Sequence, residues 1–136
     1  MGVSWVFEHD KTAKEVERLL EGGGAEQIGT FTVDCLPYTP NDKLTGVEYR
    51  LRDFVVRVGT ATQVTTTKGV IVEVEYEPSQ VAAQSAHMMT EMMQMFFPQY
   101  ARNKPDVINK SSSEPYSALD TMYQYLTIFR NMRKKA

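Results

Sequence analysis

The stretch FVVRVGTATQVTTTKGVIVEVEY, residues 54–76, decides the fold. Apolar residues occupy every second position on either side of its polar middle, and these are Phe54, Val56, Val58, Val70, Val72, Val74 and Tyr76. Successive side chains of a strand point to opposite faces of a sheet, so this spacing indicates two strands that each have one buried face. A polar loop that ends in glycine joins them, and we therefore predict an antiparallel hairpin with Val56, Val58, Val70 and Val72 in the core of the sheet.

The reverse face of this hairpin is mixed in character. Val55 and Ile71 are apolar, and we expect them to meet a partner or the interior of a barrel. Glu73 and Glu75 lie two residues apart and therefore share the reverse face. We expect that face to be solvated around them rather than to hold an acid–base pair.

Two strands and a helix are predicted near the N-terminus. Residues 3–7 are β-branched and aromatic, which favours a short strand. Thr12 and Glu15 have the spacing of a capping box, so an amphipathic helix is expected to begin there and to end at the glycines 22–24. Residues 28–33 alternate in polarity as a half-buried strand does.

The segment before the hairpin holds a loop and a change of phase. Prolines, Asn41 and Gly46 predict a loop over residues 36–46. Apolar residues then alternate over 47–51 in one phase and continue in the other phase after Arg52 and Asp53. Since a strand has period two, this change predicts a bulge, a bend or the junction of two separate strands.

Two further helices are expected after the hairpin. The first follows Pro78, ends at Pro98 and has a 3.6-residue apolar period over Val81, Ser85, Met88, Met89, Met92, Met95 and Phe96. Residues 98–116 are predicted to be a flexible connector. The last helix begins with a cap at Ser117 and Asp120 and is expected to bury Leu119, Met122, Leu126 and Phe129, with Tyr125 and Met132 beside them. The whole pattern predicts an α+β domain with mostly antiparallel pairing and helices covering one face.

Length and composition restrict the class of protein. The chain has 136 residues, 42% of them hydrophobic, and a formal net charge of −2. This size supports a single domain, residues 1–136, with one hydrophobic core. One cysteine excludes an internal disulfide framework, and the near-neutral charge gives no general attraction for nucleic acid. No apolar run approaches the ~20 residues that span a bilayer, so no membrane segment is expected.

Residues that could carry chemistry are few. His9, His87 and Cys35 are the only imidazoles and thiol, and none has the spacing of a zinc site. The glycines 22–24 follow a predicted helix, whereas a phosphate-binding loop precedes one. We therefore expect no catalytic residue, no cofactor-binding residue, no cofactor and no metal ligand. An enzyme that uses Cys35 as a nucleophile stays open as an alternative.

Two clusters allow both a structural and a binding role. Met88, Met89, Met92, Met93 and Met95 make one predicted helix rich in methionine, which suits core packing or an adaptable binding groove. Met93 lies off the main apolar stripe and widens it. Arg130, Arg133, Lys134 and Lys135 end the last helix, where they complement the helix dipole or contact an acidic partner or nucleic acid.

Five stretches, taken together and in order, resemble subunit 20 of the Mediator complex. They are MGVS at 1–4, GAEQIGTFTVDC at 24–35, DFVVRVGT at 53–60, GVIVEVEY at 69–76 followed by Pro78, and DTMYQY at 120–125 with the basic tail behind it. The resemblance covers most of the chain. It implies a sheet that curls toward a barrel with flanking helices, distantly similar to the TATA-binding protein.

The same resemblance implies a function. It points to a nuclear, non-catalytic scaffold subunit in the head module of Mediator, a coactivator of regulated transcription by RNA polymerase II. It implies direct pairing with Mediator subunit 18, attachment of the C-terminal segment of subunit 8 to the same submodule, indirect contact with the RNA polymerase II machinery, and no cofactor. For the partner interface we expect Val55, Ile71, Met89, Met93 and Tyr123.

The chain departs from the family pattern in one place. Family members usually carry further strands and a helix between the stretch that ends at Cys35 and the one that starts at Asp53. The domain is therefore expected to be shortened between about 36 and 52, either as a genuine loop or because segments are missing from the sequence. A sheet without its central strands has exposed edges, which favour pairing with another chain.

An alternative from another class is a module that contacts DNA or RNA directly through the basic C-terminal helix. It predicts tight binding that weakens steeply with salt. The net charge of −2 and the pair Glu73 and Glu75 disfavour direct contact with nucleic acid.

Overall fold

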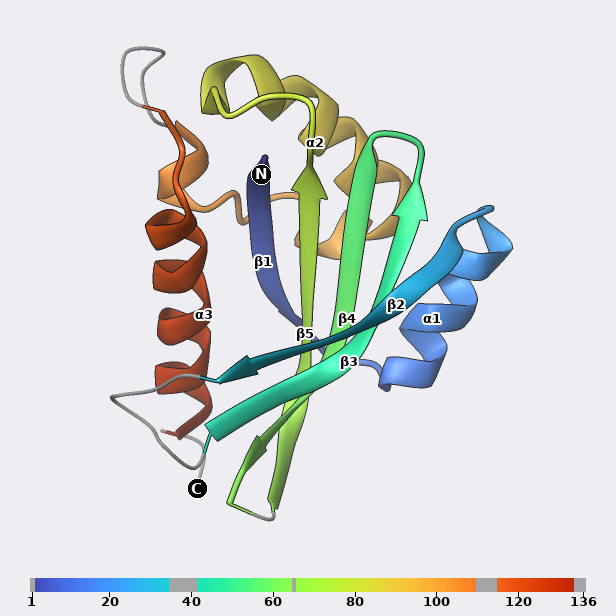
Figure 1. Cartoon of the computed structure of the whole chain (residues 1–136), viewed down its shortest axis with the longest axis vertical. Coiled ribbons are helices and arrows are strands. Elements are labelled where there is room, and N and C mark those ends of the chain that lie inside the picture. The colour runs from blue at the N-terminus through green and yellow to red at the C-terminus, as the bar shows by residue number, and fades with distance from the viewer. Residues whose placement is uncertain (1, 35–41, 65, 110–114, 134–136) are drawn as a thin grey trace.

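The computed structural model describes residues 2–34, 42–64, 66–109 and 115–133. Within these ranges the elements are β1 Val3–His9, α1 Ala13–Gly22, β2 Glu26–Asp34, β3 Asp42–Leu51, β4 Phe54–Gln63, β5 Thr66–Tyr76, α2 Ala82–Phe96 and α3 Ala118–Arg133. The strands form one antiparallel sheet in the order β1-β5-β4-β3-β2. Figure 1 shows β2 and β3 crossing the other strands obliquely, so the sheet curls without closing into a barrel. The predicted α+β class is confirmed.

The hairpin predicted from residues 54–76 is confirmed as β4 and β5. Val58 lies opposite Val72, and Val56 lies opposite Val74. Val56, Val58, Val70 and Val72 are all buried in the larger of two hydrophobic cores. The alternation of apolar residues was therefore sufficient to predict this pair of strands.

The change of phase at Arg52 and Asp53 is the junction of two separate strands. β3 ends at Leu51, β4 begins at Phe54, and these two residues lie opposite each other. Arg52 has φ of 55°, in the left-handed region that two-residue hairpin turns use. Of the three explanations that the sequence left open, this one is correct.

The loop predicted over 36–46 is wrong at its C-terminal end. Residues 42–46 belong to β3, where Leu44 is fully buried. Gly46 suggested a turn, but a Cβ atom at this position would lie 1.9 Å from the carbonyl oxygen of Val58. Glycine within a strand can mark a close approach between backbones, and Gly46 is such a case. Residues 36–41 of the predicted loop lie outside the described residues.

Helices cover both faces of the sheet, and the prediction that they cover one face is wrong. α1 and α2 pack on one face, where Trp5, Val16 and Met89 belong to the larger core. α3 packs on the other face, where Phe129 and Ile71 belong to a second core (Figure 1). Because strands such as β5 carry apolar residues on both faces, each face needs its own cover.

Both long helices after the hairpin bury part of the stripe that their spacing predicted. The residues buried as expected are Ser85, Met89, Met92 and Phe96 in α2 and Tyr125, Phe129 and Met132 in α3. In α2, Met93 is fully buried beside Met89 and Met92, whereas Met95 is 74% exposed. In α3, Leu119 is 79% exposed, although we expected it to be buried. The residues of α3 that are buried are Gln124, Tyr125, Phe129 and Met132. A buried glutamine on this helix is the feature that hydrophobic periodicity could not reveal.

The connector of residues 98–116 packs more closely than predicted. It contains two short 3₁₀ helices, Pro98–Tyr100 and Asp106–Asn109. The side chains of Ala101, Ile108 and Tyr116 are buried, and they belong to the larger core. Residues 110–114 lie outside the described part of the chain.

The first helix is capped as predicted. The Thr12 hydroxyl accepts a hydrogen bond from the Glu15 amide at 3.2 Å, while the Thr12 amide donates to the Glu15 carboxylate at 3.3 Å. Gly24 follows the helix with φ of 97°, a conformation that favours glycine. α1 therefore begins and ends for local reasons that the sequence contains.

The stability of the fold is expected to depend on pH through His9. Burial lowers the pKa of His9 below its usual 6.5, although Asp10 opposes the shift, and its Nδ1 accepts a hydrogen bond from the Lys11 amide at 3.0 Å. The unfolded chain binds this proton more readily, so the free energy of unfolding should fall as the pH drops below 6.5. Urea unfolding at about pH 7.5 and about pH 5.5 should show this loss, and His9→Phe should reduce it. An equal pH dependence in both proteins would contradict the assignment to His9.

Candidate functional site

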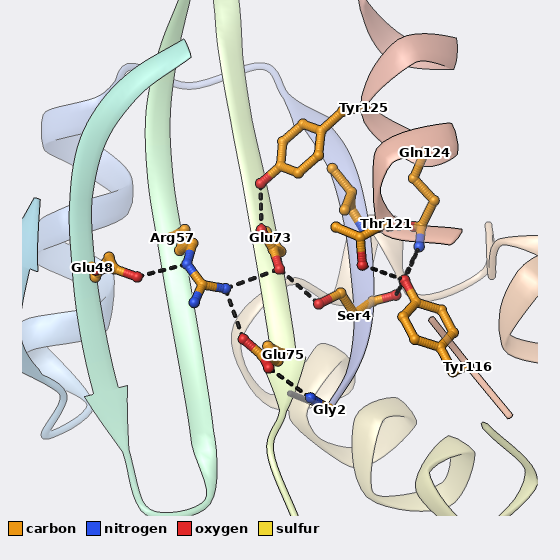
Figure 2. A network of polar contacts seen from close by, with 11 residues as sticks. Gly2, Ser4, Glu48, Arg57, Glu73, Glu75, Tyr116, Thr121, Gln124 and Tyr125 are labelled. Atoms are coloured by element: carbon orange, nitrogen blue, oxygen red, sulfur yellow. Dashed lines mark hydrogen bonds and ion pairs between the residues drawn. The ribbon is translucent and has the colours of Figure 1, made fainter. Parts of the chain in front are cut away.

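An arginine surrounded by three carboxylates lies on the face of the sheet that α3 covers. Arg57 of β4 contacts Glu48 of β3 through Nε at 2.6 Å, and Glu73 and Glu75 of β5 through Nη1 at 2.9 Å and 2.8 Å (Figure 2). The register places Arg57 directly opposite both Glu48 and Glu73 on the neighbouring strands. Strand pairing therefore builds this cluster from residues distant in sequence.

Glu73 and Glu75 are each only 6% exposed, so the prediction of a solvated face around them is wrong. The Tyr125 hydroxyl, on α3, donates to Glu73 at 2.5 Å, and the Ser4 hydroxyl, on β1, donates to the same carboxylate at 2.7 Å. The Gly2 amide donates to Glu75 at 2.8 Å. Arg57 and α3 therefore contact the two carboxylates where we had expected solvent.

Arg57 and Tyr125 of this cluster both keep their protons at neutral pH. Burial opposes the charge of Arg57, but the carboxylates of Glu73, Glu75 and Glu48 outweigh it and raise the pKa of Arg57. Burial and the charge of Glu73 raise the pKa of Tyr125 well above its usual value. At neutral pH the guanidinium stays charged and the phenol stays a hydrogen-bond donor. The arrangement holds strands and α3 together.

The outer edge of β1 is covered by side chains. Val6 donates its amide to the Gln124 side-chain oxygen at 2.8 Å, and the Gln124 side-chain nitrogen donates to the Ser4 carbonyl at 2.8 Å. The Tyr116 hydroxyl also donates to the Ser4 carbonyl, at 3.2 Å (Figure 2). Burial raises the pKa of Tyr116 to about 12, so this hydroxyl keeps its proton. Gln124 takes the place of a neighbouring strand at this edge.

The outer edge of β2 is open as far as the described residues show. β2 pairs with β3 on one side, and no strand in the described ranges pairs with it on the other. Residues 27–33 are uncharged, and Ile28 is half exposed at a register shift between Gln27 and Gly29. An uncharged, unpaired edge strand is a surface on which another strand can add.

A groove of about 460 Å³ runs between β2 and α3. β2 contributes Phe31, Thr32 and Val33 to its walls, and α3 contributes residues that include Met122 and Tyr125. Charged residues also line it, namely Arg57, Glu73, Glu75 and Glu77. The groove therefore has partly apolar walls, more carboxylates than cations, and one wall that is an open strand edge.

The structure separates the five residues that the sequence suggested for a partner interface. Val55, Ile71, Met89 and Met93 are buried within the chain, in the sheet and under the helices. Tyr123 is 63% exposed on α3. Of the five, Tyr123 is the residue that a partner can reach on the folded chain.

Sequence reasoning missed Arg57 and Gln124, and it misjudged Glu73 and Glu75. The sequence did contain a signal for Arg57, which is a lone charge within the apolar run 54–58. A charge in such a position is rarely buried without a partner of opposite sign. Gln124 carried no comparable signal, since a polar residue on an amphipathic helix is usually solvent-exposed.

The other candidate residues do not gather into a site. His87 is exposed and pairs with Glu91 at 3.0 Å on α2. Cys35, Lys134 and Lys135 lie outside the described residues. In the part of the chain that the structure describes, no group of three or more His, Cys, Asp or Glu residues could hold a metal ion. No helix in those ranges is long and apolar enough to cross a membrane.

Comparison with known proteins gives a consistent result. Residues 43–130 match the family described as the TATA-binding related factor (TRF) of subunit 20 of Mediator complex. A protein of Caenorhabditis briggsae named Mediator of RNA polymerase II transcription subunit 20 is 36% identical over 197 aligned residues, which cover 99% of this chain and all of that relative. Because the alignment is longer than this chain of 136 residues, the relative carries residues that the chain lacks.

Vertebrate proteins of the same name match a shorter part. The proteins of Mus musculus and Homo sapiens are 37% and 36% identical over 90 residues, which cover 66% of this chain. The match spans 42% of the length of each of these relatives.

Proposed function

Since the chain belongs to the TATA-binding-related family of Mediator subunit 20, we propose that it is a non-catalytic scaffold subunit of Mediator that pairs directly with subunit 18 in the head module. In this proposal it works in the nucleus and supports regulated transcription by RNA polymerase II, which it contacts indirectly. The C-terminal segment of subunit 8 attaches to the same submodule. The family match over residues 43–130 is the observation that carries the proposal.

The geometry of the described residues supports a role in binding rather than in chemistry. The polar cluster around Arg57 joins β3, β4, β5 and α3, and its members are held by one another. The open edge of β2 and the groove beside it offer a surface for another chain. A scaffold subunit needs a rigid body and an exposed docking surface of this kind.

The charge of the groove disfavours direct contact with nucleic acid. The groove is lined by Glu73, Glu75 and Glu77 with Arg57 as the cation among its lining residues. Carboxylates repel phosphates, so this surface disfavours DNA or RNA.

Co-expression with Mediator subunit 18 from the organism that carries this chain is expected to give a complex with one copy of each chain. Obligate partners of this type share large interfaces, so the complex should survive size-exclusion chromatography, and light scattering should report the summed mass. The control is the chain expressed alone. A chain that elutes as a monomer unchanged by subunit 18 would contradict the proposal.

A further inference from the structure

We propose that the groove between β2 and α3 receives an extended, basic segment of the partner protein, which adds to the open edge of β2 and places an arginine or lysine against the carboxylates of the groove. This inference rests on the proposed scaffold function and names the surface and the chemistry of its partner. The groove has a volume of about 460 Å³. Phe31 and Val33, which line it from β2, also pack against the second core, to which Tyr125 and Phe129 of α3 belong.

The two edges of the sheet differ, and the difference locates the docking surface. At β1 the outward Ser4 carbonyl and Val6 amide are already bonded to Gln124. At β2 no strand of the described chain occupies the outer side. A segment that adds to a sheet by backbone hydrogen bonds therefore has β2 available and β1 blocked.

The charge of the groove selects a basic segment. Its lining residues include three carboxylates and one cation. Glu73 and Glu75 share Arg57, which also pairs with Glu48. Glu77 pairs at 2.7 Å with Arg50, which does not line the groove. Each carboxylate oxygen accepts more than one hydrogen bond, so these groups can bind a further cation without losing Arg57. A guanidinium or ammonium from a partner would balance charge that the chain leaves uncompensated.

The apolar walls of the groove can pack against the uncharged parts of an extended segment. Phe31 and Val33 of β2 and Met122 of α3 provide apolar surface on either side of the charges. The aliphatic stem of an arginine or lysine packs on such surface while its charged end reaches a carboxylate. Alternate side chains of an added strand would therefore find apolar and acidic environments in turn.

A second copy of this chain does not fit the groove. The uncharged stretch 27–33 of β2 would bring no cation to the carboxylates, and its flanking residues Glu26 and Asp34 are acidic. Pairing of β2 with β2 of a second copy would therefore leave the carboxylates of the groove without a cation. The occupant is therefore a different chain.

Two substitutions of opposite charge at Met122 test the inference. Met122 is partly exposed, lines the groove and lies within α3, where lysine and glutamate are both good helix formers. Met122→Lys should weaken binding of subunit 18 by about tenfold or more, because it repels the basic segment. Met122→Glu should bind within about threefold of the original chain, or more tightly. Titration by isothermal calorimetry of each purified variant against subunit 18 gives the affinities.

The matched control is Met95→Lys, which makes the same change on the exposed face of α2, away from this groove. It should leave the affinity unchanged. Hydrogen exchange at residues 29–33 should slow in the complex, because the added strand protects β2. Equal affinities for both Met122 variants, equal weakening by both, or unprotected amides at 29–33 would each overturn the inference.

These results separate the inference from the proposed function. If subunit 18 binds the original chain and both Met122 variants equally, the scaffold function stands and the groove is not the docking surface. If subunit 18 does not bind the original chain at all, the proposed pairing fails, and the inference fails with it. If the chain alone forms a dimer that Met122→Lys disrupts, the occupant is a second copy, and the inference is wrong.

Discussion

Replacing Arg57 with leucine is expected to lower the free energy of unfolding by about 3–5 kcal/mol, because two buried carboxylates lose the cation that they share. Glu73 and Glu75 are 6% exposed, and Arg57 contacts both through a single Nη1 atom. Leucine fills a similar part of the space but supplies no positive charge. Urea unfolding followed by circular dichroism at neutral pH measures the loss.

The matched control is Arg50→Leu. Arg50 pairs with Glu77 at 2.7 Å, but both side chains are well exposed to solvent. Exposed ion pairs contribute at most about 1 kcal/mol, so this variant should unfold almost like the original chain. A loss as small for Arg57→Leu as for Arg50→Leu would show that the cluster does not stabilise the sheet.

Replacing Gln124 with leucine is expected to lower the free energy of unfolding by about 2–3 kcal/mol, since buried backbone groups of β1 lose their partners. The Val6 amide would be left without its acceptor, and the Ser4 carbonyl would keep the hydrogen bond from Tyr116 alone. The free energy of opening at the Val6 amide, measured by hydrogen exchange, should fall by the same amount. Both quantities can be measured on the isolated chain.

Gln94→Leu provides the comparison for this variant. Gln94 is exposed on α2, and a surface substitution there should change the free energy of unfolding by about 0.5 kcal/mol or less. If Gln124→Leu were as stable as Gln94→Leu, the side-chain cover of the β1 edge would be unimportant for stability. The proposed contrast between a closed β1 edge and an open β2 edge would then lose its support.

Local patterns predicted most of the elements. The period of two over 54–58 and 70–76 identified the hairpin. The Thr12 and Glu15 capping box identified the start of α1. Each of these signals depends on neighbouring residues in the chain, which is why the sequence alone was enough.

The candidate site could not be predicted in the same way. Glu73 looked solvated because the residues beside it in the chain alternate normally, and its burial depends on Arg57 of β4 and Tyr125 of α3. Gln124 looked like a surface residue, and its role depends on the edge of β1. Contacts between distant segments decide both cases, and a single sequence does not reveal them.

By itself, the sequence determined the antiparallel hairpin, the boundaries set by glycine, proline and capping residues, and the family to which the chain belongs. The tertiary structure alone decided that α3 covers the reverse face of the sheet and that Arg57 gathers three carboxylates there. It also decided that side chains cover the edge of β1, whereas no strand of the described ranges pairs with the outer edge of β2. The physical reason is that alternation and capping arise from adjacent residues, whereas burial of a charge and closure of an edge depend on which distant segment packs against them.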